Sequence, residues 1–305
     1  MKNRVLGWAL SGILCLSAGE ATWACAFHGY TPDPTLVDVL LATEQVAVVR
    51  LDPANPSRYT LLQVLAGPDV SEFPIPVTDS IRRTLVARPS ASLLVARDGA
   101  YGPWMALTIL DPRFQKVITR VVERQADLLN GGDDARLALF AKLLNSESAA
   151  VRHLALQELD RVAYSSLRTA RIPKVQGLQR ALETGDEELM PVRVLLAGLS
   201  GDQSYSSFLS GELDMAVEGR LPYMGAYATA LIELNGKSAV QEIIDRYLKP
   251  RVLPLETRTK LLEALSVQHK AAPRSTRREI ARDIAELLRD SPDLREPAAR
   301  FFGLR

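Results

Sequence analysis

Cysteine and histidine are scarce in this chain of 305 residues, which has two of the former and three of the latter. Cys15 lies in an apolar N-terminal segment, so a chain that loses this segment keeps Cys25 alone. A single cysteine excludes an internal disulfide. The fold must therefore be stabilised by packing, for which a hydrophobic content of 47 % is ample.

An excess of either charge is also missing. The chain has 37 Lys and Arg against 36 Asp and Glu, and 35 of each remain without Lys2, Arg4 and Glu20. A net charge near zero argues against nucleic acid or an anionic membrane surface as the main partner. Catalytic signatures such as Gly-x-Ser-x-Gly, His-Glu-x-x-His and Cys-x-x-Cys are absent from the sequence. We therefore expect no enzyme, and an active site assembled from distant residues is the alternative.

The first 24 residues have the order of a secretory signal peptide. Lys2 and Arg4 precede an apolar run from Val5 to Ala18, and small residues follow it. This run of about 14 residues is shorter than the ~20 that span a bilayer, which favours a cleaved signal over an anchor. No other segment reaches that length without charges. We expect a periplasmic or secreted protein with no membrane span in its mature chain.

The cleavage site decides the fate of Cys25. Cleavage after Ala24 would place Cys25 at the mature N-terminus, whereas cleavage after Ala26 would remove it. A lipid anchor at Cys25 is a third alternative. Thr22 and Trp23 disfavour it, because lipoprotein signals carry a leucine three residues before the cysteine and small residues between.

The mature sequence changes character near residue 112, and we expect one domain over 25–111 and another over 112–305. The first domain has a helix candidate at 35–43, because Thr35 can cap a segment with helical apolar spacing. Five short strands are then expected, at 45–51, 58–65, 73–77, 92–97 and 104–110. Pro74 and Pro76 confine the third strand to an edge. This order favours a small closed or half-closed barrel.

Three strand sequences carry a resemblance to a known family. Val46 to Arg50 reads Val-Ala-Val-Val-Arg, Tyr59 to Gly67 fits Tyr-x-x-x-x-Val-Leu-x-Gly, and Leu93 to Gly99 reads Leu-Leu-Val-Ala-Arg-Asp-Gly. Together with a cysteine at the start of the mature chain, they resemble the netrin-like or OB-like domains of secreted proteins. The chain departs from that family because it lacks the family's other cysteines. The resemblance implies a small β-barrel and, in one branch, a metalloprotease inhibitor whose N-terminal cysteine caps the metal.

From residue 112 onward almost every segment has the apolar spacing of a helix. Similar lengths and short connections favour stacked antiparallel helix pairs, with an irregular helical bundle as the alternative. The overall class is α+β, mainly α. Helices are expected at 113–129, 133–144, 148–164, 174–184, 187–199, 205–213, 222–234, 238–248, 255–265, 274–290 and 294–302.

One helix pair carries a recognisable repeat pattern. In residues 145–159 a polar turn precedes Val-Arg-x-x-Ala-x-x-x-Leu, with Val151, Ala155 and Leu159 on one helix face. The small Ala155 would let a neighbouring helix approach closely, and Arg152 would point toward the carboxylates of the turn. This segment resembles the core of a HEAT repeat, an armadillo-type α-solenoid unit. The resemblance implies an α–α superhelix with a concave binding surface.

Cys25 and His28 are the one cysteine–histidine pair close together in the sequence. A thiolate and an imidazole three residues apart can share copper(I) or zinc, and the α-amine of an N-terminal Cys25 would be a third donor. The alternative is that Cys25 is removed, lipidated or a lone thiol. The sequence thus offers copper or zinc as a possible cofactor and indicates no other.

Two further features bear on binding. The loop over 97–104 holds Tyr101 and Trp104 among glycines and could form a partner-binding tip; alternatively Trp104 packs inward at the start of the fifth strand. His153 is expected on a polar helix surface. His269 is expected in a solvated segment between helices.

These observations favour an exported, non-catalytic binding or scaffold protein of a bacterial-type cell envelope. It would engage another envelope protein through its helical repeat surface. The competing hypotheses are a copper- or zinc-binding envelope protein that uses Cys25 and His28, and a netrin-like protease inhibitor.

Overall fold

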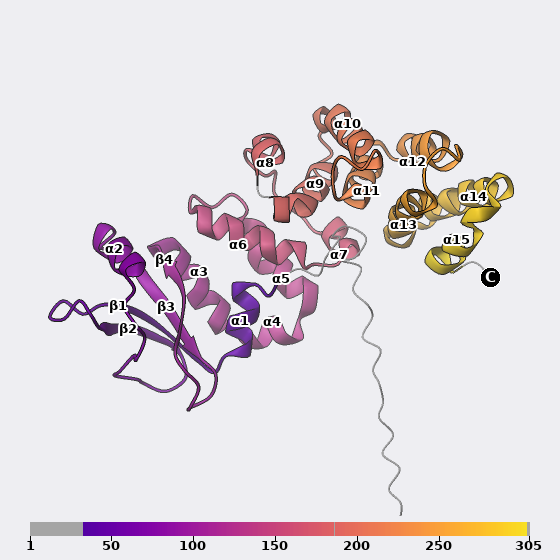
Figure 1. Ribbon diagram of the computed structural model, residues 1–305. Helices are drawn as coiled ribbons and strands as arrows, with labels where there is room; N and C mark the ends of the chain where they lie inside the picture. The colour runs from indigo at the N-terminus through magenta and orange to yellow at the C-terminus, as the bar shows by residue number, and fades with distance from the viewer. Residues whose placement is uncertain (1–32, 186, 304–305) are drawn as a thin grey trace, which may run out of the picture.

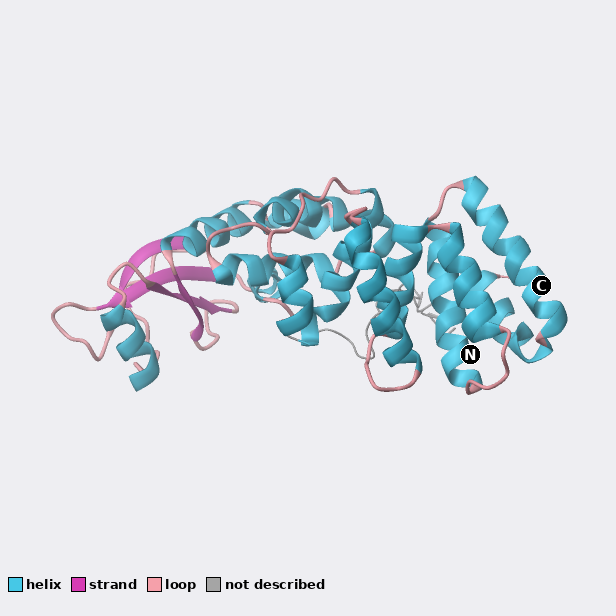
Figure 2. Cartoon of the chain, turned by 90° about the horizontal axis from the view of Figure 1, so that it is seen from above, coloured by secondary structure: helices cyan, strands magenta, loops and turns pink. Residues whose placement is uncertain are grey.

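The computed structural model describes residues 33–185 and 187–303, so the expected signal peptide lies outside the described part. The chain is mainly helical with one small antiparallel sheet, as the sequence predicts. The sheet lies at one end of an elongated molecule, and the helices lead away from it toward the C-terminus (Figures 1 and 2). None of the described helices combines the length and the apolar character that crossing a membrane would require.

The N-terminal part contains the sheet and two helices. Helix α1 (Leu36–Ala42) begins as expected at Thr35, whose hydroxyl accepts the amide of Asp38 while the Asp38 carboxylate accepts the amide of Thr35. The strands are β1 (Gln45–Leu51), β2 (Tyr59–Ala66), β3 (Ser92–Arg97) and β4 (Met105–Leu110). Their order is β2-β1-β3-β4, with all neighbours antiparallel. The sheet is open, so the expected barrel closure is wrong for this part of the chain.

The expected third strand does not form. Residues 73–77 are irregular, with the Ile75 amide donating to the Phe73 carbonyl at 2.7 Å, and the Phe73 side chain packs on the sheet. Pro74 and Pro76 explain this, because alternate residues of a strand donate toward the same neighbour and both of these lack the N–H. In its place the chain forms a helix that the sequence analysis missed, α2 (Asp79–Ala87), capped by the Thr78 hydroxyl.

Both faces of the sheet are buried, which explains the unbroken apolar runs in β1 and β3. One face packs beneath α2 and residues 73–77. The other joins the core of the helical part, to which α3 (Pro112–Glu123) contributes through Phe114 and Ile118. The expected boundary at residue 112 coincides with the start of α3, where Asp111 caps the helix and Pro112 opens it. The core nevertheless runs on across this point.

A buried ion-pair network ties α1 to the helices that follow. Arg136 of α5 (Gly132–Phe140) donates to Asp38 at 3.0 Å and also pairs with Glu158 of α6 (Ala149–Asp160). The Glu158 side chain has no exposed surface, and burial raises its pKa. Removing one partner of such a pair would leave the other charge buried without compensation.

The remaining helices follow the expected segments with shifted ends. They are α4 (Gln125–Asn130), α7 (Tyr164–Thr169), α8 (Leu178–Thr184), α9 (Met190–Leu199), α10 (Ser206–Val217), α11 (Met224–Asn235), α12 (Lys237–Ile243), α13 (Leu255–Ala271), α14 (Arg274–Asp290) and α15 (Arg295–Phe302). Short 3₁₀ turns precede α9, α10 and α15, and a π-helical turn, Ile244–Leu248, continues α12.

Several helices form a continuous row of successive contacts. Helix α6 contacts α9, α9 contacts α11, α11 contacts α13 and α13 contacts α15. Helices α8, α10 and α14 each pack on one member of this row, as Figure 1 shows. Helices α9 and α11 approach tightly where Gly198 meets Ala230, because a Cβ built on Gly198 would lie 2.6 Å from the Ala230 Cα. Small residues therefore set the spacing of this pair.

Candidate functional site

A hollow of about 430 Å³ lies where the pair α8–α9 meets the pair α10–α11. We call it the tyrosine groove. Its lining combines aromatic and aliphatic side chains with carboxylates. The lining residues are Leu182, Glu183, Gly185, Glu187, Met190, Phe208, Glu212, Leu221, Pro222, Tyr223 and Tyr227.

Two helices supply the groove's main side chains through i, i+4 spacing. Phe208 and Glu212 lie one turn apart on α10, and Tyr223 and Tyr227 lie one turn apart at the start of α11. Residues at this spacing share a helix face, so each helix presents two of its side chains to the same hollow. The packing of α10 on α11 then brings the two faces together.

Tyr223 has the backbone conformation that is unusual in the groove. Its φ is 65° and its ψ 31°, which makes it the one non-glycine residue with positive φ among those the structure describes. This left-handed conformation costs an L-residue about 1–2 kcal/mol. The Tyr223 carbonyl accepts the amides of Ala226 and Tyr227, so the turn opens α11 while the ring lines the groove. Strained residues of this kind cluster at functional sites.

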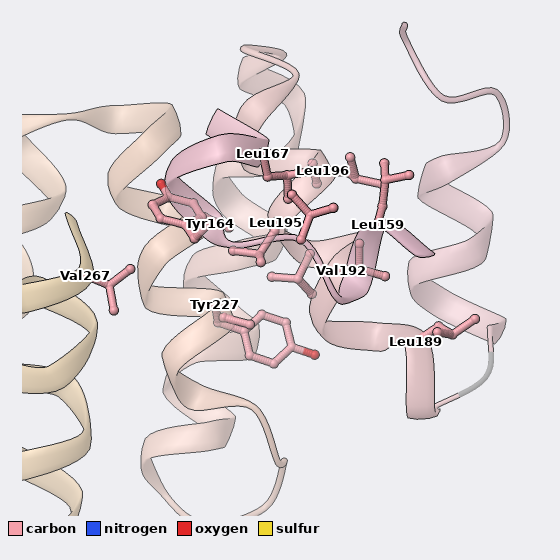
Figure 3. Close-up of a cluster of buried hydrophobic side chains, with 14 of the residues drawn as sticks. Leu159, Tyr164, Leu167, Leu189, Val192, Leu195, Leu196, Tyr227 and Val267 are labelled. Atoms are coloured by element: carbon pink, nitrogen blue, oxygen red, sulfur yellow. The ribbon is translucent and has the colours of Figure 1, made fainter. Parts of the chain in front are cut away.

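The lining residues of the groove include the carboxylates of Glu183, Glu187 and Glu212 but no Lys or Arg, while the Arg193 guanidinium lies beside Gly185 at its edge. Burial raises the pKa of Glu212, and no hydrogen bond or ion pair from the described residues reaches its carboxylate. Burial, together with the charges of Glu212 and Glu187, raises the pKa of Tyr227 to about 12. The Tyr227 ring is 4 % exposed. Its hydroxyl points toward the side of the core cluster where Leu189 lies (Figure 3). These groups leave negative charge beside aromatic rings.

A second hollow, of about 590 Å³, lies on the other side of α8 and shares Gly185 with the tyrosine groove. Its polar lining comes largely from the segment that resembles a HEAT repeat. Arg152 donates to the carbonyl oxygens of Ser146 at 2.6 Å and Glu147 at 3.2 Å. The expectation that Arg152 meets the turn's carboxylates is thus wrong: it binds the turn's backbone, and the Glu147 carboxylate pairs with Arg113. These groups stabilise the turn.

A third polar cluster is buried between helices α7, α11 and α13. Glu233 accepts hydrogen bonds from the Tyr164 hydroxyl, from Arg168 at 2.5 Å and from Gln268 at 3.0 Å. Gln268 also donates to the Thr229 carbonyl at 3.2 Å. Since these groups satisfy one another, the cluster serves to join three helices.

Tyr101 and Trp104 do not form a shared tip. Tyr101 is fully exposed, whereas Trp104 is 8 % exposed and packs inward just before β4. The Phe73 ring meets Trp104 edge-on at 5.1 Å, and the Arg97 guanidinium lies 4.9 Å from its ring centre. Of the two expectations for Trp104, the one in which it packs inward is therefore correct. Partner binding by Tyr101 stays a prediction.

Cys25 and His28 lie outside the described residues, so copper or zinc binding there stays a prediction. Over 33–185 and 187–303, no three His, Cys, Asp or Glu side chains gather closely enough to hold a metal ion. His153 lies on the exposed side of α6, as expected. His269 was placed wrongly. It belongs to α13, is half-buried against Phe302 at 5.3 Å, and has a pKa lowered by burial and by Arg277.

The sequence analysis missed every residue of the tyrosine groove. Its lining residues come from three separate segments of the sequence, 182–190, 208–212 and 221–227. A local signal did exist in the i, i+4 pairs Phe208–Glu212 and Tyr223–Tyr227. A helix face that joins an aromatic ring to a carboxylate is common on ordinary surfaces, however, so this signal gains meaning only from the hollow.

Comparison of the chain with protein-family models, with curated proteins and with solved structures found no match in any of the three. The geometry of the groove is therefore the basis on which a function is proposed.

Proposed function

We propose that this chain is an exported, non-catalytic binding or scaffold protein of a bacterial-type cell envelope, and that it engages a partner protein at the tyrosine groove. The observation that carries the proposal is the groove itself, where aromatic rings and carboxylates line a hollow between two helix pairs. Strongly apolar floors with a few polar groups are typical of binding sites.

We also infer that the helical part is a HEAT-like α-solenoid. The support is the row α6, α9, α11, α13 and α15, in which each helix contacts the next while α8, α10 and α14 pack on its members. A stack of this kind buries a continuous core and presents long rows of loops and grooves to a partner. The tyrosine groove lies between two neighbouring units of the stack, where such proteins have accessible surface.

The experiment is chemical cross-linking of the protein in an envelope fraction, followed by identification of the linked partner. Tyr223→Gly removes the groove's strained side chain, and glycine adopts φ 65° without steric cost. Val252→Ala is the matched control, because Val252 is an exposed apolar residue away from the groove, at 89 % exposure. We expect one partner to be linked to the wild type and to Val252→Ala but lost from Tyr223→Gly.

The proposal fails if Tyr223→Gly links the same partner as the wild type, or if the wild type links none. Circular dichroism of the three proteins shows whether Tyr223→Gly has kept its helical fold. A folded variant that loses the partner supports the groove as the binding surface.

A further inference from the structure

The carboxylate of Glu212 differs from that of Asp214 on the same helix, because no described cation pairs with it. Asp214, two residues along the same helix, has Arg246 at 2.8 Å and accepts the Tyr247 hydroxyl at 2.6 Å. Glu212 has neither kind of contact from any described residue, although burial raises its pKa. A half-buried carboxylate normally gains a charged or hydrogen-bonding partner. The structure therefore leaves one negative group in the tyrosine groove uncompensated.

Tyr227 supplies a second, independent indication of a ligand. Its side chain is more than nine-tenths buried and lines the groove, but its hydroxyl has no hydrogen-bond partner among the described residues. The hydroxyls of the similarly buried Tyr164 and Tyr247, by contrast, bind Glu233 and Asp214. Among the described residues, the Tyr227 oxygen does not belong to the fully buried polar atoms that lack a partner, so it reaches the space of the groove. The Tyr227 hydroxyl thus offers an acceptor to a group that enters the groove.

The rings around these two groups suit a planar cation. Phe208, Tyr223 and Tyr227 line the same hollow as Glu212 and Glu187. Aromatic faces attract guanidinium and ammonium groups, and a guanidinium also stacks on a ring while its fork of N–H groups meets a carboxylate. An ammonium makes the same charge contact but cannot stack. The groove therefore matches an arginine side chain better than a lysine side chain.

We propose that the tyrosine groove binds an arginine side chain from a basic segment of the partner protein, with Glu212 accepting from its guanidinium. This inference rests on the proposed function and specifies the chemistry of the partner's contact. Glu183 is already engaged by Gln179 at 2.8 Å, so Glu212 and Glu187 are the carboxylates that meet the cation. The aromatic rings exclude water from one side and strengthen the charge contact.

The test is a calorimetric titration of the full protein with three short peptides at millimolar concentration. They are identical except for a central arginine, lysine or citrulline; citrulline keeps the shape of arginine without its charge. We expect the arginine peptide to bind, the lysine peptide to bind more weakly and the citrulline peptide not to bind. Binding of citrulline equal to that of arginine, or absence of arginine binding, would overturn the proposal. If the lysine peptide binds as tightly as the arginine peptide, the stated preference for a guanidinium over an ammonium group is wrong.

Two variants locate the contact. Glu212→Gln keeps the shape of the side chain and removes its charge, and should weaken the arginine peptide by about tenfold or more. Glu256→Gln is the matched control, because Glu256 is an exposed carboxylate on α13 that pairs with Lys260, and it should leave the affinity unchanged. An equal loss in both variants would contradict a specific role of Glu212.

This test separates the present inference from the proposed function. If the arginine peptide does not bind while the cross-linked partner still depends on Tyr223, the arginine proposal is wrong and the binding function stands. If the arginine peptide binds through Glu212 but no partner is linked in the envelope fraction, the ligand chemistry stands and the proposed function is wrong.

Discussion

The close approach of α9 to α11 gives a prediction whose sign the structure decides. A Cβ added at Gly198 would lie 2.6 Å from both the Cα and the carbonyl oxygen of Ala230, and 2.8 Å from its Cβ. Carbon atoms in contact are ordinarily about 3.5–4.0 Å apart. Two of the three obstructing atoms are backbone, which cannot rotate away as a side chain can. The Gly198→Ala substitution therefore requires α9 and α11 to separate by about 1 Å.

Two opposing effects determine its magnitude. Alanine is a better helix former than glycine, by at most about 1 kcal/mol. Overpacking of a core contact costs about 1–3 kcal/mol, and here α11 also packs on α13, so α11 cannot shift freely. We expect Gly198→Ala to lower the free energy of unfolding by about 1–2 kcal/mol. Gly211 is the matched control, because it lies in the exposed middle of α10 with nothing within 4 Å of an added Cβ.

The assay is urea unfolding followed by helical circular dichroism, with the wild type and both variants compared at their midpoints. Gly211→Ala should raise the midpoint, by an amount equivalent to about 0.5–1 kcal/mol. Gly198→Ala should lower it. If both substitutions raise the midpoint, the helices are not as closely packed as described, and small residues do not set the spacing of this row.

Two ion pairs give further predictions. The pKa of Asp38 lies below its ordinary 3.8. Burial acts to raise this pKa, but the hydrogen bonds from the Thr35 amide and the Arg136 guanidinium outweigh the effect of burial. The stability that Asp38 supplies is therefore present above that value and is lost as pH falls through the lower folded pKa. Asp38→Asn should cost about 1–3 kcal/mol at neutral pH and reduce the further loss in acid; equal acid sensitivity in urea melts would contradict this. Arg258 is buried and pairs with the partly exposed Asp293 at 2.5 Å, so Arg258→Ala should cost about 1–3 kcal/mol through the lost charge-assisted hydrogen bond. A thermal midpoint equal to the wild type's would refute it.

Local signals in the sequence were enough to place most elements. Thr35 caps α1 as expected, and the helix starts expected at residues 113 and 148 lie within one residue of α3 and α6, where the Asp111 and Ser148 side chains accept nearby backbone amides. Strands β1 and β3 have the predicted ends, because their apolar runs are bounded by turn residues. These features depend on contacts within a few residues, which a single sequence displays directly.

Elements held by distant contacts were predicted poorly. Helix α13 was expected to end at Leu265, yet it continues to Ala271. Gln268 explains the difference, since its buried amide donates to Tyr164, to the Thr229 carbonyl and to Glu233. The last turns of α13 are thus held by partners of Gln268 that come from α7 and α11.

The sequence by itself determined the fold class, an N-terminal antiparallel sheet followed by many short helices, because hydrophobic period and capping act over one or two turns. Tertiary structure alone decided that the sheet stays open, that Trp104 packs inward and that Tyr223 adopts a left-handed conformation. It also formed the tyrosine groove, in which Glu212 of one helix and Tyr227 of the next line the same hollow. The physical reason is that the burial and electrostatic environment of a side chain depend on residues far away in the chain. The packing of the helices determines which of these residues become its neighbours.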